Sequence, residues 1–215
     1  ADKVIISARI EGKINDKNGI GLFLVDNNQI NNRSYNTIDG YRAAELNFDN
    51  INAELLCEDD LALECIIKAN SAGALALSAE AVGIMQVCFD LTLDYLKTRR
   101  QFGKSIGSFQ SIQHRMVDMM LEIEQVRSAV MLASSTFGTN PSTRDKNISA
   151  AKNLVGRVGK LIAEESIQLH GGIAMTWEYS VAHYAKRLIM IDHLMGDEDY
   201  HLSLIHISEP TRPSQ

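Results

Sequence analysis

Two short segments carry residue types that could contact a bound ligand. The first runs from Tyr95 to Gly107 and contains Arg-Arg-Gln-Phe-Gly at 99–103. A guanidinium offers a forked donor to a pyrophosphate, and an aromatic ring offers a flat face to an adenine or a flavin. The alternative is structural, because positive side chains at a helix C-terminus also stabilise the helix dipole. The spacing alone leaves both interpretations open.

The second segment runs from Gln168 to Gly172 and reads Gln-Leu-His-Gly-Gly. A single glycine would be explained as the cap of the preceding helix, whereas two in succession also let a ligand approach bare backbone. The residues by themselves favour the helix cap.

Other chemistry is weakly represented in this sequence. The motifs GxGxxG, HExxH and CxxC and the phosphate-binding loop do not occur. Asp197, Asp199 and His201 are too few to predict a metal site, and we expect none. His170 and His193 lie near expected helix ends, where structural histidines are more common than catalytic ones.

The composition narrows the class of protein. The chain has 215 residues, with 21 Lys+Arg, 27 Asp+Glu and a net charge of −6, which argues against a nucleic acid as the main partner. We see no apolar run of the roughly 18 residues that a membrane span needs. Three cysteines without metal-ligand spacing indicate reduced, partly buried thiols of a cytoplasmic, bacterial protein: Cys57, Cys65 and Cys88.

Residues 1–58 have the character of β-structure. Short β-branched runs at 4–10 and 20–25 and an alternating run at 43–48 predict strands, the last with Ala44, Leu46 and Phe48 on its buried face. Asn31 and Asn32 are read as part of a turn. Four short strands cannot bury a core alone, so we expect them to be part of a larger antiparallel sheet.

Residues 59–201 have helical periodicity. Apolar residues recur every three or four positions in four stripes: Leu75 to Leu96, Ile112 to Phe137, Ile148 to Ile162 and Val181 to Met195. Glycine and proline separate the stripes. The expected fold is α+β but mainly α, with a partial antiparallel β-domain followed by an antiparallel four-helix bundle.

The end of the chain, residues 202–215, differs from what precedes it. It contains Pro210 and Pro213 and matches an in-frame translation of a transposon-end adapter used in sequencing libraries. We therefore predict that this segment is non-native and exclude it from fold reasoning. The first residue is not Met, so we expect an internal fragment of a longer protein.

The two segments, together with Thr-Trp-Glu-Tyr at 176–179, resemble the C-terminal half of acyl-CoA dehydrogenases, which are flavoproteins. The resemblance covers residues 1–201 and implies FAD as the cofactor, an acyl-CoA as the substrate and an electron-transfer flavoprotein as the acceptor. It also implies FAD contacts, partly across a dimer interface, from Arg99, Gln101, Phe102, Ile106, Phe109, Gln168, Leu169, Gly171 and Gly172.

The same resemblance exposes a departure at the catalytic base. The family removes a proton from the α-carbon of the thioester with a glutamate, and that position holds Met195 here. The alternative glutamate position on the first bundle helix holds Gly73. The family's nearby arginine and substrate-binding acid fall at Ala74 and Ser71. Asp197 is the remaining, weak candidate for a base.

A closer resemblance accounts for this loss. Residues 183–192, Gly196-Asp197 and residues 79–83 are similar to the small subunits of heteromeric enzymes such as pimeloyl-CoA dehydrogenase. It implies a large-subunit paralogue that carries the glutamate and shares FAD at the interface. Two alternatives stay open: a non-catalytic, FAD-binding scaffold, and a homo-oligomer that uses Asp197.

Overall fold

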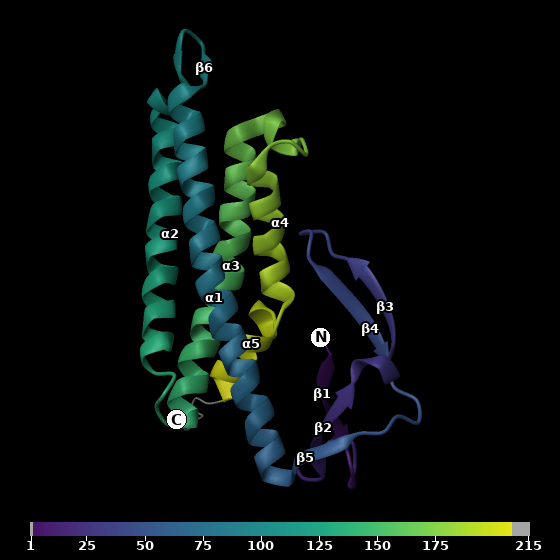
Figure 1. The fold of residues 1–215 in the computed structure, drawn as a ribbon. Helices are drawn as coiled ribbons and strands as arrows, with labels where there is room; N and C mark the ends of the chain where they lie inside the picture. The colour runs from purple at the N-terminus through teal and green to yellow at the C-terminus, as the bar shows by residue number, and fades with distance from the viewer. Residues whose placement is uncertain (1, 208–215) are drawn as a thin grey trace, which may run out of the picture. The chain divides into compact units, whose positions relative to one another are not determined.

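The computed structural model describes residues 2–207, which divide into two compact units (Figure 1). The first unit is Ala1–Asn70 and the second is Ser71–Gln215. The first contains the strands up to Glu58 and the beginning of the long helix α1, Asp59–Thr98. The second contains the other helices and the candidate site, so its geometry can be described independently of the first.

The first unit contains two small antiparallel sheets. Strands β1 (Lys3–Arg9), β2 (Ile20–Asp26) and β5 (Glu54–Glu58) form one sheet in the order β1-β2-β5. Strands β3 (Asn31–Asn36) and β4 (Arg42–Asn47) form a hairpin. A short 3-10 turn at Asn27–Gln29 separates β2 from β3. The predicted antiparallel β-structure is confirmed.

Two details of this unit were predicted wrongly. Asn31 and Asn32 begin β3 instead of forming a turn, because each pairs with a residue of β4 in an unbroken ladder. Ala44, Leu46 and Phe48 are exposed instead of half-buried, because the hairpin forms a sheet of its own with only two strands.

The second unit is the predicted antiparallel helical bundle (Figure 1). After α1 come α2 (Gln110–Ser135), α3 (Pro141–His170) and α4 (Ser180–His193). Helix α3 has a well-formed start: Asn140 Oδ1 accepts a hydrogen bond from the Thr143 amide at 2.9 Å, and proline occupies the first turn. A fifth helix, α5 (Glu198–Ile207), was not predicted.

The core follows the predicted stripes in α2 and α3, where Met119, Val126, Val155 and Ile162 are buried. In α1 the predicted stripe is confirmed at Val82, Met85 and Leu96, which are buried, whereas Ala79 is exposed. Its buried face includes two hydroxyl residues, Ser78 and Thr92, which donate to the carbonyls of Ala74 and Cys88 one turn earlier. In the fourth stripe Tyr184 and Met195 are exposed.

Two further observations concern α1 and the end of the chain. By length and composition α1 is apolar enough to cross a membrane, contrary to the sequence reading, but a helix that packs into a core passes the same test. Residues 202–207 of the proposed adapter segment continue α5, whereas residues 208–215 lie outside the described residues. The adapter origin stays a prediction.

The three cysteines are free: Cys88 is buried, Cys57 is half-buried and Cys65 is exposed. Burial raises the pKa of the Cys88 thiol to about 12, so this residue behaves as a small apolar core residue.

Candidate functional site

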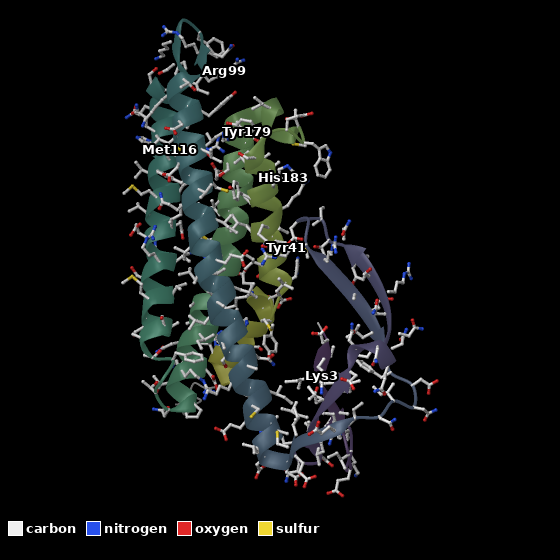
Figure 2. All side chains as sticks on the ribbon, viewed as in Figure 1. Lys3, Tyr41, Arg99, Met116, Tyr179 and His183 are labelled. Carbon is white, nitrogen blue, oxygen red and sulfur yellow. The ribbon has the colours of Figure 1, made fainter. Side chains whose placement is uncertain are left out.

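The two predicted segments lie at the same end of the helical bundle (Figure 2, where Arg99 and Tyr179 are labelled). Tyr95, in the last turn of α1, stacks on His170, the last residue of α3, with ring centroids 4.6 Å apart. The Tyr179 ring packs against the same imidazole, with ring centroids 5.0 Å apart. The structure therefore brings together two segments that are about seventy positions apart in the sequence.

The first segment forms a small β-hairpin after α1. Strands β6 (Arg100–Gln101) and β7 (Lys104–Ser105) pair, and a 3-10 turn, Ile106–Ser108, leads into α2. Phe102 lies at the tip with a φ of 54° and is 90% exposed. A left-handed backbone is strained for a residue other than glycine, and an aromatic ring in solvent buries no apolar surface. The position of Phe102 therefore favours a contact with a ligand or another subunit.

The polar side chains of this hairpin differ in their contacts. Arg100 donates to the Gly103 carbonyl at 3.3 Å. Within residues 2–207 the side chains of Arg99 and Gln101 have no hydrogen-bond or ion-pair partner. Their donors are therefore available to an anionic or polar ligand, and their role in binding FAD stays a prediction.

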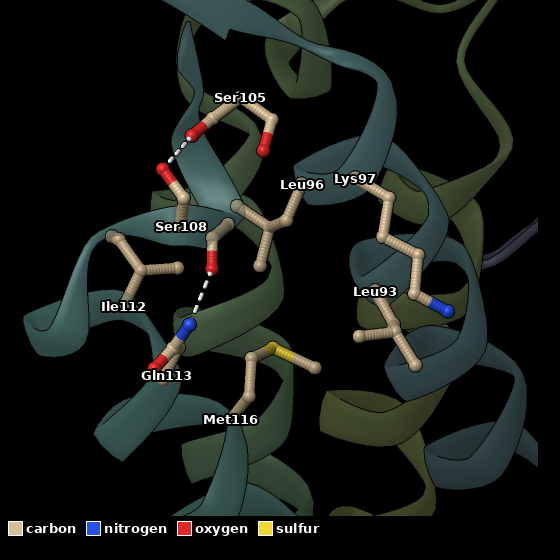
Figure 3. A pocket seen from close by; sticks show the side chains of 9 residues that line it. Leu93, Leu96, Lys97, Ser105, Ser108, Ile112, Gln113 and Met116 are labelled. Atoms are coloured by element: carbon tan, nitrogen blue, oxygen red, sulfur yellow. Dashed lines mark hydrogen bonds between the residues drawn. The ribbon is translucent and has the colours of Figure 1, made fainter.

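An open groove lies beside the hairpin, between the end of α1 and the start of α2 (Figure 3). Its volume is about 380 Å³, and its floor is apolar while Lys97 lies at its edge. Gln113 and Ser108 fix the rim by donating to the carbonyls of Gly107 and Ser105 at 3.1 and 2.7 Å.

Sequence reasoning missed this groove, although its apolar residues belong to stripes that were recognised: Leu93, Leu96, Ile112 and Met116. Ile106 and Phe109, which were predicted to flank the cofactor, are half-buried and are not among the residues that line the groove. Phe109 meets the Phe102 ring edge-on at 6.2 Å and lies under the Lys104 ammonium at 4.1 Å.

The second segment ends α3. Gly171 has a φ of 69°, which explains it as the helix cap, and a β-carbon added at Gly171 or Gly172 would meet nothing within 4 Å. The backbone there is open to a ligand. Gln168 is exposed, whereas the Leu169 side chain packs into the core and is not available on the surface.

His170 joins these elements through its Nδ1 atom and the faces of its ring. Its Nδ1 lies 2.7 Å from the Ser166 carbonyl. Burial lowers the pKa of His170, and the backbone carbonyls of Ser166 and Leu91 oppose that shift. A buried imidazole between two tyrosines acts here as a structural connector, in agreement with the sequence reading.

The two positions where the family places its base lie against each other. A β-carbon at Gly73 would come within 3.1 Å of the Met195 Cε, so the Met195 side chain covers Gly73. Ser71, at the position of the family's substrate-binding acid, donates to Asp145 at 2.8 Å, and Asp145 pairs with Arg144 at 2.7 Å. Ala74 is buried in the core.

Asp197 is exposed and has a structural task. Its Oδ1 accepts a hydrogen bond from the Tyr200 amide at 2.8 Å and so caps the start of α5. This engagement lends no support to a catalytic role. In the part of the chain that the structure describes, no group of three His, Cys, Asp or Glu side chains could hold a metal ion.

Comparisons with known proteins agree with this geometry. Residues 63–208 match the family model described as "Acyl-CoA dehydrogenase, C-terminal domain". The chain is 37% identical over 123 residues to acyl-CoA dehydrogenase IpdE2 of Mycolicibacterium smegmatis, covering 57% of this chain and 38% of that protein. It thus spans well under half the length of this curated relative.

Solved structures share the fold. One described as PigA with FAD and proline has a TM-score of 0.86 and 24% identity, over 96% of this chain and 56% of that one. The ChsE4-ChsE5 complex of Mycobacterium tuberculosis has a TM-score of 0.84 and 19% identity, over 100% of this chain and 57% of that one. The chain belongs to the acyl-CoA dehydrogenase family.

Proposed function

We propose that this chain is one subunit of an FAD-dependent acyl-CoA dehydrogenase whose catalytic glutamate comes from a partner subunit. The observation that carries the proposal is a contrast within one unit. Both base positions are occupied by apolar or small residues in mutual contact, Met195 and Gly73, while the nucleotide-facing groups at the bundle end remain open. Such a chain retains cofactor binding and lacks proton abstraction.

The end of the bundle fits the nucleotide part of FAD by its chemistry. The guanidinium of Arg99, which has no partner among residues 2–207, suits a pyrophosphate, and Phe102 offers an aromatic face. The open backbone at Gly171 and Gly172 allows close approach, and the apolar groove beside the hairpin gives a surface for a planar ring. When bound, FAD would accept the hydride that leaves the β-carbon of the acyl thioester.

A partner subunit is supported by a surface of this chain and by a relative. Helix α2 carries exposed apolar side chains along its outer face: Val117, Met120, Leu121, Met131 and Leu132. Exposed apolar surface of this extent marks an interaction site in soluble proteins. The ChsE4-ChsE5 complex, which shares the fold, is itself a complex of two differently named chains. We also propose that an electron-transfer flavoprotein accepts the electrons and that the protein is cytoplasmic.

The decisive experiment co-expresses the full-length protein with a paralogue that carries the glutamate. Each protein alone and the pair together are loaded with FAD and mixed anaerobically with acyl-CoAs that differ in their acyl groups. Flavin bleaching by the pair, and not by this subunit, is the expected result. A pair whose partner carries glutamine in place of that glutamate is the matched control and should not bleach.

Other outcomes would replace the proposal. Bleaching by this subunit alone would favour a homo-oligomer that uses Asp197. No bleaching in any combination, despite bound FAD, would favour a non-catalytic scaffold.

A further inference from the structure

A buried lysine lies beneath the turn between α4 and α5. The Lys152 side chain, on α3, has no solvent-exposed area. Its ammonium donates to the Asp192 carbonyl at 2.9 Å and to the Gly196 carbonyl at 2.8 Å. Lysine is almost never fully buried unless its charge has partners, so these contacts define a specific site for the ammonium group.

Two more side chains bind carbonyls of the same turn. His201 Nε2 lies 2.9 Å from the Met195 carbonyl, and Asn153 donates to the Glu198 carbonyl at 3.0 Å. Four carbonyls of residues 192–198 are therefore bound by side chains. A connecting turn held in this way has little freedom to rearrange.

Carboxylates balance the buried charge. The Asp192 carboxylate lies against Gly156, where any larger residue of α3 would exclude it, and it accepts a hydrogen bond from the Glu198 amide at 3.1 Å. Desolvation lowers the pKa of Lys152, while Asp192 and Asp197 raise it. Both carboxylates thus favour the charged ammonium.

The turn holds an unfavourable backbone conformation. Met195 has a φ of 57° and Gly196 a φ of 94°. A non-glycine residue keeps such a φ only where its surroundings hold it there. In this conformation the Met195 side chain covers Gly73 of α1.

We infer that Lys152 is a positioning residue that fixes the turn of residues 192–198 and thereby holds the side chain at position 195 over Gly73. This role matters for catalysis only if the proposed function is correct, because position 195 is where the family carries its glutamate. Lys152 would thereby keep the Met195 side chain in the space that a base at position 73 would need. The test measures conformation, so it can fail or succeed independently of any measurement of turnover.

The experiment is a double-mutant cycle in the full-length protein. Gly73→Val places a branched side chain where even a β-carbon would lie 3.1 Å from Met195. Gly83→Val, on the same helix, is the matched control because a β-carbon there meets nothing within 4 Å. With Lys152 present, we expect Gly73→Val to have a Tm lower than that of Gly83→Val by about 2–4 °C.

In the Lys152→Met background the freed turn can move away, so this difference in Tm should disappear. Lys160→Met removes an exposed lysine from the same helix and should leave the difference intact. Lys152→Arg, which keeps a cation with several donors, should restore part of it. An equal difference with and without Lys152 would overturn the inference, because a merely structural lysine gives additive effects.

A measurement on the unmodified protein covers the case in which Lys152→Met does not fold. The Leu194 amide donates a hydrogen bond to the Ile191 carbonyl, and the Glu198 amide donates to the Asp192 carboxylate. If the turn is fixed, they should exchange hydrogen at least about tenfold more slowly than the exposed amides of Gly138 and Asn140 in the loop before α3. Exchange as fast as that loop would refute the positioning role.

Discussion

Tyr95 stacks on His170 with ring centroids 4.6 Å apart and ring planes inclined by 30°. The Arg99 amide donates to the Tyr95 carbonyl at 2.8 Å, and Gly171 directly follows His170. This one contact therefore sets the spacing between the hairpin and the glycine pair. A ligand that binds both segments meets a distance fixed by core packing, which reduces the conformational entropy lost on binding.

Replacing Arg99 by alanine should weaken FAD binding in the intact assembly. A hydrogen bond to a charged group contributes about 1.5–3 kcal/mol, so we expect affinity to fall roughly ten- to a hundredfold. Titration of FAD into the apo assembly, followed by flavin fluorescence, measures the change. Arg100→Ala is the control, since that guanidinium bonds to its own hairpin. Unchanged affinity in Arg99→Ala would remove Arg99 from the site.

Stability should fall as the pH drops below about 6.5, the ordinary pKa of histidine. Burial lowers the pKa of both His170 and His201 in the folded protein. At a pH between the histidine pKa values of the unfolded and the folded protein, the unfolded chain binds more protons. The free energy of unfolding therefore decreases as the pH falls through this range, and these histidines do not change it at higher pH. Urea unfolding at a series of pH values measures this slope.

A variant separates one histidine from the other. His170→Phe keeps an aromatic ring between Tyr95 and Tyr179 but cannot bind a proton. The slope of unfolding free energy against pH should then fall by up to about 1.4 kcal/mol per pH unit. An identical slope in this variant would show that His170 is not buried as a neutral group.

Sequence reasoning found the features that depend on local signals. The buried stripes of α2 and α3 follow from apolar spacing, and the end of α1 near Arg99 and the cap at Gly171 follow from residue types next to helix ends. Each of these signals depends on only a few neighbouring residues. Strands β1, β2 and β4 were located for the same reason, whereas β3 and β5 were not.

Features that depend on tertiary contact were missed. Nothing local predicts that Tyr95 meets His170, that Met195 covers Gly73, or that a lysine on α3 is fully buried. Lys152 was overlooked because a lysine within a helix normally points to solvent. The start of β3 was read as a turn because asparagine favours turns, while pairing with β4 overrides that preference.

The ion pair between α1 and α4 should contribute to the stability of the bundle. Arg187, whose side chain is 12% exposed, donates to both carboxylate oxygens of Glu80 at 2.6 and 2.8 Å. Glu80→Gln should lower the free energy of unfolding by about 1.5–3 kcal/mol, and partial exposure of Glu80 favours the lower figure.

The control for this pair is Glu124→Gln. Glu124 pairs with Arg127 on the same helix at 3.1 Å, and both side chains are exposed. Its loss should cost less than about 0.5 kcal/mol. Chemical denaturation of both variants measures the two costs. Equal costs would mean that the α1–α4 pair contributes no more than a surface pair.

A charge on the outer face of α2 should disrupt assembly without unfolding the chain. Leu121 is 57% exposed and lies between Val117 and Met131 on that face. Leu121→Glu would place a carboxylate into an apolar contact if this face meets a partner, and burying an unpaired charge is strongly unfavourable. Light scattering of the full-length protein should show a lower mass at the same concentration.

Asp118→Asn, an exposed polar change on the same helix, should leave the mass unchanged. Circular dichroism should report equal helix content in both variants, because neither position belongs to the core of the bundle. A Leu121→Glu protein that keeps the mass of the unmodified assembly would show that subunits meet through another surface. The exposed apolar face of α2 would then need a different partner to cover it.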